Sequence, residues 1–537
     1  MSNFFKKFIA CTLLCAIAFT TVACKKNKDK GDNVLYVYSF TSGFGSEWLA
    51  SAIADYTAAT GVTVKPTTVK DDVPGADMKN RQEVVYFLEQ QDYYGLVGNS
   101  YVADISSAIT SVNPYDGKKL EDKMFQDQKD YFKRDGHYYA FPHYFTPFGI
   151  VYDVEMFDTK GFYFVKGYNP AGSLESKFVS DIGGDKTAGP DGVEGNSDDG
   201  LPTTYQEFLW LCEFIASKSL KPIVWAGETQ TRKAYLTHFI NAMATDYEGR
   251  EQMLLNFSFD GVAKNLGTVQ AGQFVEDSSD TPISSANGYE LARQAGKFYA
   301  MKFYKDLYNS PAIRDADSAN TLFSSSYSHT SAQEDFLSDD KYAMLFDGGW
   351  WQTEATNVFN LLALSDSADS KMNKKLGWMP LPKHPDKVGE KQTMYDVMYP
   401  LCLVKNIDVE SWEYKTAIDF IQFINSDAQL AKFNKITGCP KSLKYDLNDA
   451  QLNELSYFGK SLYRAYKNAD IVFPYDNNTT FNNNQLKLQE IDKTGTGSPL
   501  YKSSKGNVFV ESLQNGTSLE EYFNGMYTYF QGLGIWG

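Results

Sequence analysis

The chain contains few of the residues and motifs on which enzyme chemistry most often depends. Its five histidines form no His-Glu-x-x-His motif and no other close metal-ligating pair; they are His137, His143, His238, His329 and His384. It has no Gly-x-Ser-x-Gly nucleophile elbow. The Gly-Lys-Ser at residues 459–461 lacks the first glycine of a phosphate-binding loop, because that position is Glu454. A glycosidase stays open, since it needs only two carboxylates and the chain has 67 acidic residues.

Cysteine and long apolar runs are also scarce. Two of the six cysteines lie in the apolar N-terminal stretch, at positions 11 and 15. Cys212, Cys402 and Cys439 are an odd number without metal-like spacing, so we expect buried free thiols. No second long apolar run follows the N-terminal one, and this favours a secretion signal over a membrane-spanning helix.

The N-terminus, "MSNFFKKFIACTLLCAIAFTTVAC", has a basic start, an apolar stretch over residues 8–22 and small residues before Cys24. "TVAC" resembles the bacterial lipobox, although Thr21 stands where leucine is usual. We therefore expect a lipoprotein signal peptide over residues 1–23, a lipidated Cys24 and a charged tether over residues 24–33. One lipidated cysteine would hold the protein on the extracytoplasmic face of the cell membrane without crossing it. The alternative is an ordinary signal peptide with a chance cysteine.

Composition indicates a large folded protein that touches polar ligands. A length of 537 residues favours two or more lobes. The net charge of −16 argues against nucleic acid as a partner, because such proteins need basic surfaces. Aromatic residues reach 15%, with 36 tyrosines, and tyrosine suits half-wet surfaces that contact polar ligands.

The first elements after the tether predict an α/β fold. Residues 33–40 read as a buried strand, residues 46–60 as a helix that Ser46 can cap and Gly61 ends, and residues 62–69 as another strand. This order predicts a parallel sheet with ligand-binding loops at the carboxyl ends of its strands. Residues 412–437 read as amphipathic helix, with Asp427 able to cap a second helix.

Several stretches, in this order, resemble the extracellular solute-binding proteins of ABC importers, family 1, to which maltose-binding protein belongs. They are the opening strand–helix–strand with "TGVTV", then "PHYFTPFGIVYDVEMFD", "LPTTYQEFLWLCEFI", "KYAMLFDGGWW", "GWMPLPKHP" and "AIDFIQFINSDAQLAKF" followed by "GCPKS". One departure is that residues 75–98 lack the family's strand with Pro-Asp.

The resemblance implies a two-lobed periplasmic-binding-protein-like fold of type II, closing on a ligand like a hinge. Residues 34–147 with 403–455 would form the first lobe, and residues 148–402 with 456–537 the second. It also implies a monomer that captures a carbohydrate for an ABC permease and does no chemistry, and we expect this carbohydrate to be an oligosaccharide.

The Asp-Gly-Gly-Trp-Trp stretch, residues 347–351, follows an apolar strand and offers two adjacent indoles. Adjacent residues in extended chain point opposite ways, so one indole should face the ligand cleft and the other the interior. The family's Gly-x-Trp favours Trp350 for the cleft and leaves Trp351 inside. The alternative is that both pack in the core.

Other candidate ligand contacts follow the same reasoning, since each stands near a predicted strand end or a crossing between lobes. They are Trp225, Glu228, Tyr144, Phe145, Tyr395, Asp396, Phe40 and Ser42. For each of these residues, a place in the core or on the surface is an equal alternative.

The stretch "DIGGDKTAGPDGVEGNSDDGLP", residues 181–202, combines acidic residues with glycines. Hard cations prefer several oxygens on a flexible loop, so Asp191, Asp198 and Asp199 are candidate ligands of a structural calcium ion. The alternative is a solvated acidic loop. We expect no other cofactor.

The sequence thus predicts a lipid-anchored receptor that delivers a sugar to an ABC permease. A surface glycoside hydrolase and a glycan-display protein without a transporter are the alternatives. Peptides, polyamines and phosphate esters stay open as alternative ligands. A phosphate site would need arginines, however, and the stretches expected to line the cleft contain almost none.

Overall fold

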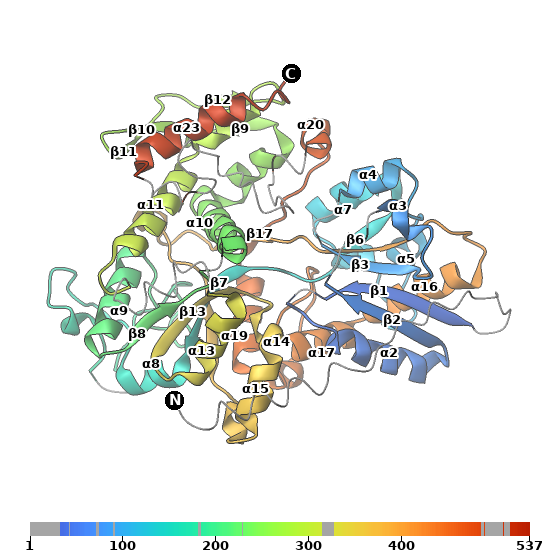
Figure 1. Cartoon of the computed structure of the whole chain (residues 1–537), viewed down its shortest axis with the longest axis horizontal. Coiled ribbons are helices and arrows are strands. Elements are labelled where there is room, and N and C mark those ends of the chain that lie inside the picture. Colours follow the sequence, from blue (N-terminus) through green and yellow to red (C-terminus); the bar gives the residue numbers. More distant parts are fainter. Residues whose placement is uncertain are drawn as a thin grey trace.

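The computed structural model describes residues 33–41, 43–70, 73, 75–89, 92–180, 184–227, 229–313, 327–484, 488, 509 and 516–537. These residues form two α/β lobes that lie side by side, with segments of chain crossing between them (Figure 1). The predicted two-lobed α/β fold is confirmed. No helix in the described part of the chain is long and apolar enough to cross a membrane.

The first lobe is built on a five-stranded sheet in the order β2-β1-β3-β16-β6. Strand β1 pairs in parallel with β2 and β3, and β16 pairs antiparallel with β3 and β6. The strands are β1 (Val34–Phe40), β2 (Thr63–Val69), β3 (Val85–Leu88), β6 (Ala140–Pro142) and β16 (Leu401–Val404). Around them lie α2 (Glu47–Thr60), α3 (Gly75–Met78), α4 (Tyr93–Gly98), α5 (Ser106–Thr110), α6 (Leu120–Lys123), α7 (Gln126–Phe132), β4 (Lys133–Arg134), β5 (His137–Tyr138), α16 (Trp412–Ile424), α17 (Asp427–Thr437) and α18 (Asp449–Asn453).

Strand β3 occupies the segment whose sequence departs from the family pattern. All four of its residues are buried, and it lies between β1 and β16 in the sheet. A buried strand without the Pro-Asp signature therefore fills this place. The pairing of β16 begins at Leu401, two residues before the predicted lobe boundary at residue 403. The lobe boundaries themselves stay a prediction.

The second lobe is built on a four-stranded sheet in the order β14-β7-β13-β8. Its strands are β7 (Phe148–Asp153), β8 (Lys221–Val224), β13 (Tyr342–Gly348) and β14 (Leu376–Met379). The helices around it include α8 (Val154–Lys160), η1 (Glu175–Lys177), α9 (Tyr205–Ser217), α10 (Thr229–Ser258), α11 (Ala295–Asn309), α13 (His329–Ser338), α14 (Trp351–Glu354), α15 (Thr356–Ala363), η3 (Ser367–Asp369), η4 (Pro385–Lys387) and α19 (Tyr457–Asn468).

An extension of the second lobe lies at the top of Figure 1. It contains β9 (Gly261–Ala263), β10 (Gly267–Gln270), β11 (Gln273–Glu276), β12 (Thr281–Ile283), η2 (Gly288–Arg293), α20 (Thr479–Asn483) and α23 (Leu519–Gln531). Two short strands, β15 (Thr393–Tyr395) and β17 (Asp470–Val472), pair in parallel beneath it.

Helix ends follow local chemistry in most places. Gly61 ends α2 with a φ of 76°, which glycine adopts without strain. Thr204 and Glu207 form a capping box at the start of α9. The predicted cap at Asp427 is wrong, because Ser426 is the N-cap of α17 and Asp427 is its first helical residue. The carboxylate of Asp427 instead binds two lysines of the first lobe.

Two crossing segments are held together by Asp396 and Thr146. The Asp396 carboxylate accepts a hydrogen bond of 3.0 Å from the Thr146 backbone N–H and another from the Thr146 hydroxyl. The Val397 N–H donates to the Thr146 carbonyl at 3.0 Å. Both side chains are almost completely buried, and burial raises the pKa of Asp396 to about 7. The sequence predicted a ligand contact for Asp396, but these partners assign it to the hinge.

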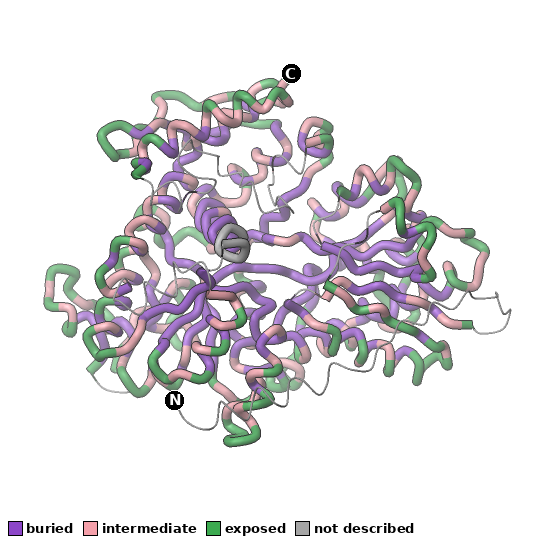
Figure 2. The backbone as a smooth tube through the Cα atoms, in the orientation of Figure 1, coloured by how far each residue is buried: buried purple, intermediate pink, exposed green. Residues whose placement is uncertain are grey.

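Burial follows the sheets and the crossing segments. Figure 2 shows the strands of both lobes and the chain between them in the colour of buried residues, with exposed residues on the outer helices and loops. Cys212, Cys402 and Cys439 are buried free thiols, which confirms the prediction from the sequence.

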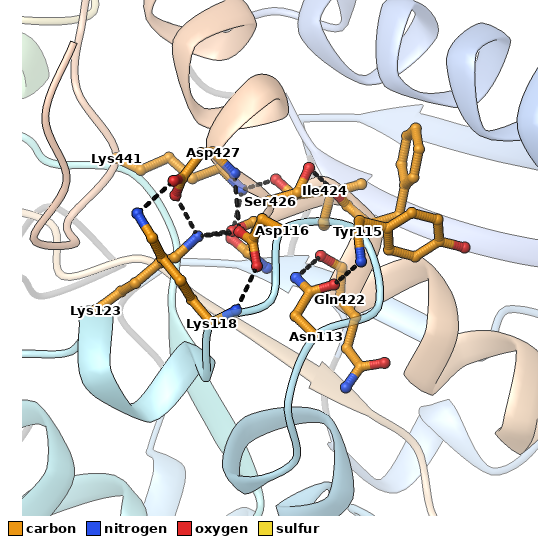
Figure 3. Close-up of polar contacts among 12 residues, drawn as sticks. Asn113, Tyr115, Asp116, Lys118, Lys123, Gln422, Ile424, Ser426, Asp427 and Lys441 are labelled. Carbon is orange, nitrogen blue, oxygen red and sulfur yellow. Dashed lines mark hydrogen bonds and ion pairs between the residues drawn. The ribbon is translucent and has the colours of Figure 1, made fainter. Parts of the chain in front are cut away.

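A buried polar cluster joins the two parts of the chain that make the first lobe (Figure 3). The Lys123 ammonium lies 2.6 Å from the Asp116 carboxylate and 2.8 Å from the Asp427 carboxylate, and it donates to the Asn425 carbonyl at 2.8 Å. Nearby, the Lys441 ammonium donates to Asn425 Oδ1 at 3.0 Å, and burial lowers its pKa to about 7. These contacts bind residues near 120 to residues near 430.

We expect Lys123→Met to destabilise the protein by about 3–5 kcal/mol, because it leaves the buried Asp116 carboxylate without its cation. The free energy of unfolding is measured by urea denaturation. The control is Lys415→Met, which removes an exposed pair with Glu410 and should change stability little. If both variants lost the same free energy of unfolding, the buried cluster would not stabilise the fold as we expect.

Candidate functional site

Trp350 lies where the two lobes meet. It follows β13 of the second lobe, and its indole contacts Gly43, which follows β1 of the first lobe. A Cβ atom on Gly43 would lie only 2.3 Å from Trp350 Cδ1, and one on Gly348 would lie 2.1 Å from Trp350 Cη2. The indole is 4% exposed. Glycine is therefore required on both sides of this ring, which accounts for the first glycine of the Asp-Gly-Gly-Trp-Trp stretch.

Trp351 has entirely different surroundings. Its side chain has no exposed surface and packs within the second lobe against Phe336, Phe359 and Phe458, with ring centroids 5.7–5.8 Å away. Helix α14 begins at Trp351, so the direction of the chain changes between the two indoles. The structure therefore assigns Trp351 to packing in the core and Trp350 to the contact between lobes.

Rings from both lobes lie near Trp350 or beside the same strand ends. Tyr235 and His238 of α10 have ring centroids 6.3 and 6.1 Å from Trp350. Burial lowers the pKa of His238 to about 3, so its ring is neutral at physiological pH. On the first lobe, Phe44 packs against Tyr144 with centroids 3.9 Å apart.

The Tyr144 hydroxyl donates a hydrogen bond to Glu89, which directly follows β3. Parallel strands β1 and β3 bring their carboxyl ends to one edge of the sheet, and this places Gly43, Phe44 and Glu89 on one side of the molecule.

A network of polar side chains surrounds Asp347, near the end of the strand that precedes Trp350. The Asp347 carboxylate accepts hydrogen bonds from the Tyr235 hydroxyl at 3.0 Å and from Gln333 Nε2 at 2.9 Å. Gln333 Nε2 also donates to Glu354 Oε2 at 2.8 Å, and His329 Nε2 lies 3.2 Å from Glu354 Oε1. The network joins the carboxyl end of β13 to the helices α10, α13 and α14.

Two carboxyl groups of this network differ in their pKa. Burial, with the nearby charge of Glu354, raises the pKa of Asp347 to about 7. Burial also acts on Glu354, but the hydrogen bond and charge of His329 outweigh it and lower the pKa of Glu354. The hydrogen bond with Glu354 raises the pKa of His329. Both shifts favour the charged form of this pair.

The first lobe also acts on this network. The positive charge of Lys70, the residue after β2, contributes to lowering the pKa of Glu354. Its effect is smaller than those of burial and of His329. A charge of the first lobe thus contributes to the electrostatics of this network.

Several predicted contact residues are used for packing. Trp225 is 5% exposed and lies among Phe239, Tyr304 and Phe346 in the second lobe. Phe145 is completely buried at the crossing, and Tyr395 of β15 is 6% exposed. We assign Trp225 and Phe145 to the core, whereas Tyr395 is buried but also lines a small cavity with Phe257 and Trp536.

The remaining predicted residues lie at strand ends or outside the described part of the chain. Tyr144 and Phe40 lie at the strand ends of the first lobe, where Tyr144 is buried and Phe40 is half-buried. Glu228, Ser42 and Cys24 lie outside the described residues. Tyr235, His238 and Gln333, which contact Trp350 or its network, were missed. Their helical segments carry no local signal, since only folding brings α10 and α13 beside β13.

The acidic loop folds on itself. The Asp191 N–H donates to Asp198 Oδ2 at 3.1 Å, and the Gly195 N–H donates to Asp199 Oδ2 at 2.8 Å. Burial, with the charge of Asp191, raises the pKa of Asp198 to about 6. Across the described residues, no three His, Cys, Asp or Glu side chains are grouped so that they could hold a metal ion. Calcium at this loop stays a prediction from sequence.

The two α/β lobes and the segments that cross between them define a two-lobed class of fold. No protein-family model matches the sequence. No curated protein matches it either. Among solved structures, the fold is similar to that of sugar-binding solute receptors.

A chitin oligosaccharide binding protein matches with a TM-score of 0.54 at 12% identity, over 93% of this chain and 98% of that one. A probable secreted solute-binding lipoprotein from Streptomyces coelicolor matches with a TM-score of 0.55 at 12% identity, over 94% and 100%. Maltose-bound MalE3 of T. maritima matches with a TM-score of 0.53 at 12% identity, over 93% and 99%.

We expect Asp347→Asn to flatten the dependence of stability on pH. A carboxyl pKa raised from an unfolded value of about 3.9 contributes stability that is full at low pH and is lost as the pH rises toward about 7. Wild-type stability should therefore fall between about pH 4 and 7, with an Asp347 contribution of up to about 1.4 kcal/mol per pH unit.

The measurement is urea denaturation of both proteins at pH 5, 6, 7 and 8. Glu410→Gln, which changes an exposed carboxylate, is the control. An Asp347→Asn protein whose stability falls with pH as steeply as that of the wild type would contradict the expectation.

Proposed function

We propose that this protein is a lipid-anchored receptor that captures a carbohydrate between its lobes and delivers it to an ABC permease. The observation that carries the proposal is the position of Trp350, which stands on the second lobe and meets Gly43 of the first. A ligand that binds both surfaces would stabilise the closed arrangement of the lobes.

The chemistry around Trp350 suits a sugar. Sugars present apolar C–H faces between hydroxyl groups, so their sites combine flat rings with polar side chains that fix orientation. Trp350, Tyr235 and Tyr144 supply rings, and Glu89 and Asp347 supply carboxylates beside them. The similarity of the fold to that of sugar-binding receptors supports the same ligand class.

The receptor would bind its ligand without chemical change. The carboxylates of Asp347 and Glu354 both accept hydrogen bonds from Gln333, and Asp347 is only 1% exposed. A general acid and a nucleophile or base for glycoside hydrolysis must reach the two sides of a glycosidic bond. These partners favour a supporting role for the two carboxylates.

Trp350→Ala tests the proposal directly. We expect it to weaken binding of a cognate oligosaccharide by about 1–3 kcal/mol, borrowing the range for an aromatic side chain stacked on a flat ligand. Trp351→Ala should leave affinity nearly unchanged but cost about 3–5 kcal/mol of folding stability, because it opens a cavity in the core.

Affinity is measured by calorimetry with maltotriose, xylotriose and chitotriose, and stability by urea denaturation. Trp210→Ala, a half-buried tryptophan on α9, is the matched control and should leave affinity unchanged. Unchanged affinity in Trp350→Ala for every sugar that the wild type binds would refute the proposed site.

The anchor rests on the sequence, since Cys24 lies outside the described residues. We expect Cys24→Ser to lose lipidation, so that the protein leaves the membrane fraction or stays unprocessed. Fractionation and mass spectrometry of the N-terminal peptide measure both outcomes. Cys212→Ser is the control, because that thiol is buried. A Cys24→Ser protein that remains processed and membrane-bound would disprove the lipid anchor.

A further inference from the structure

A second concave surface lies wholly on the second lobe. It is a groove of about 540 Å³, within the usual size of a small-molecule site. Its sides are the acidic loop, residues 189–198, and the segment of residues 388–392. Trp378 and Pro380, at the end of β14, and the face of α19 around Arg464 complete it. Its lining residues lie at 189–203, 378–392 and 461–468, all within the second lobe, so we call it the outer groove.

The outer groove has an apolar rim. Val193 of the acidic loop is 59% exposed and Val388 of the opposite segment is 50% exposed. They are among the few large apolar side chains that the described residues leave strongly exposed. Segments nearly 200 residues apart in the chain thus present valines to one groove. Pro190 and Pro380 add further apolar lining. Exposed apolar surface gathered in one hollow indicates a binding surface.

Charged groups of both signs line the same groove. The Arg464 guanidinium donates to the Ser197 hydroxyl, and a guanidinium has five N–H donors in all. Asp191 and Asp198 lie in the same acidic loop as Ser197, and Asp198 accepts a hydrogen bond from the Asp191 backbone N–H at 3.1 Å. Burial and the charge of Asp191 raise the pKa of Asp198, as expected for two carboxylates without a cation between them.

The other charged side chains of the groove already have partners. The Lys391 ammonium lies 2.6 Å from Asp470, and the Glu390 carboxylate lies 3.2 Å from the Lys387 ammonium. The Asp191 oxygens also accept hydrogen bonds, from the Val193 N–H at 2.8 Å and from Asn196 Nδ2 at 3.0 Å. Arg464 and the two aspartates nevertheless give the groove charges of both signs. An anion would meet the two carboxylates, and a simple cation would meet the guanidinium.

A neutral ligand with many hydroxyl groups is repelled neither by the carboxylates nor by the guanidinium. Each hydroxyl can accept from Arg464 or donate to a carboxylate. The C–H faces of a pyranose ring would cover Val193 and Val388. We propose that the outer groove is a second carbohydrate-binding site, which takes a neutral oligosaccharide independently of the site between the lobes. Such a site would hold a longer glycan at the surface of the receptor while the lobes open and close.

The test uses the whole protein carrying Trp350→Ala, so that the remaining binding reports the outer groove. Maltotriose, xylotriose and chitotriose are titrated by calorimetry. We expect at least one to bind this variant, and we expect the added change Val388→Asp or Arg464→Leu to weaken that binding at least ten-fold. Val409→Asp, at a similarly exposed valine of the first lobe, is the matched control and should have no effect. Both valines are exposed, so the folded state should tolerate these changes.

The outer groove is refuted if Trp350→Ala abolishes binding of all three sugars, or if the groove variants bind as tightly as their parent. The proposed function fails separately. If Trp350→Ala binds as tightly as the wild type while Val388→Asp and Arg464→Leu lose binding, the site between the lobes is refuted and the outer groove stands.

Discussion

The Asp396 carboxylate accepts hydrogen bonds from the backbone and hydroxyl of Thr146, 250 residues earlier in the chain. This contact joins two segments that cross between the lobes, and the rest of the structure depends on it. Its almost complete burial removes competition from water, so the two crossings keep a fixed spacing. In this arrangement of the crossings, Trp350 of the second lobe lies against Gly43 of the first.

The first lobe needs a late segment of the chain to complete its sheet. Strand β16 lies between β3 and β6, so the sheet is incomplete until residues beyond 400 arrive. Lys123, Asp116 and Asp427 then join the two parts through buried charges (Figure 3). Burying charge is costly unless each group has a partner. The cluster therefore favours the one arrangement in which residues near 120 and near 430 meet.

The second lobe carries two surfaces of different character. At the contact between lobes, Trp350 is covered by glycine and supported by the network of Asp347, Gln333 and Glu354, which gives a rigid site. The outer groove is open, with exposed valines and charges of both signs. A ligand would be enclosed at the first surface, whereas the open groove leaves a ligand partly exposed to solvent.

The sequence by itself determined the local elements and the class of fold. Gly61 and Thr204 set helix ends through backbone freedom and capping, and the order of strand and helix patterns indicated two α/β lobes. Only the tertiary structure decided which side chains do what. Trp350 and Trp351 are identical and adjacent, yet the start of α14 sends one to the first lobe and the other into the core. Asp396 serves the hinge because Thr146 lies beside it. Long-range neighbours of this kind leave no local pattern, since their proximity exists only after the chain has folded.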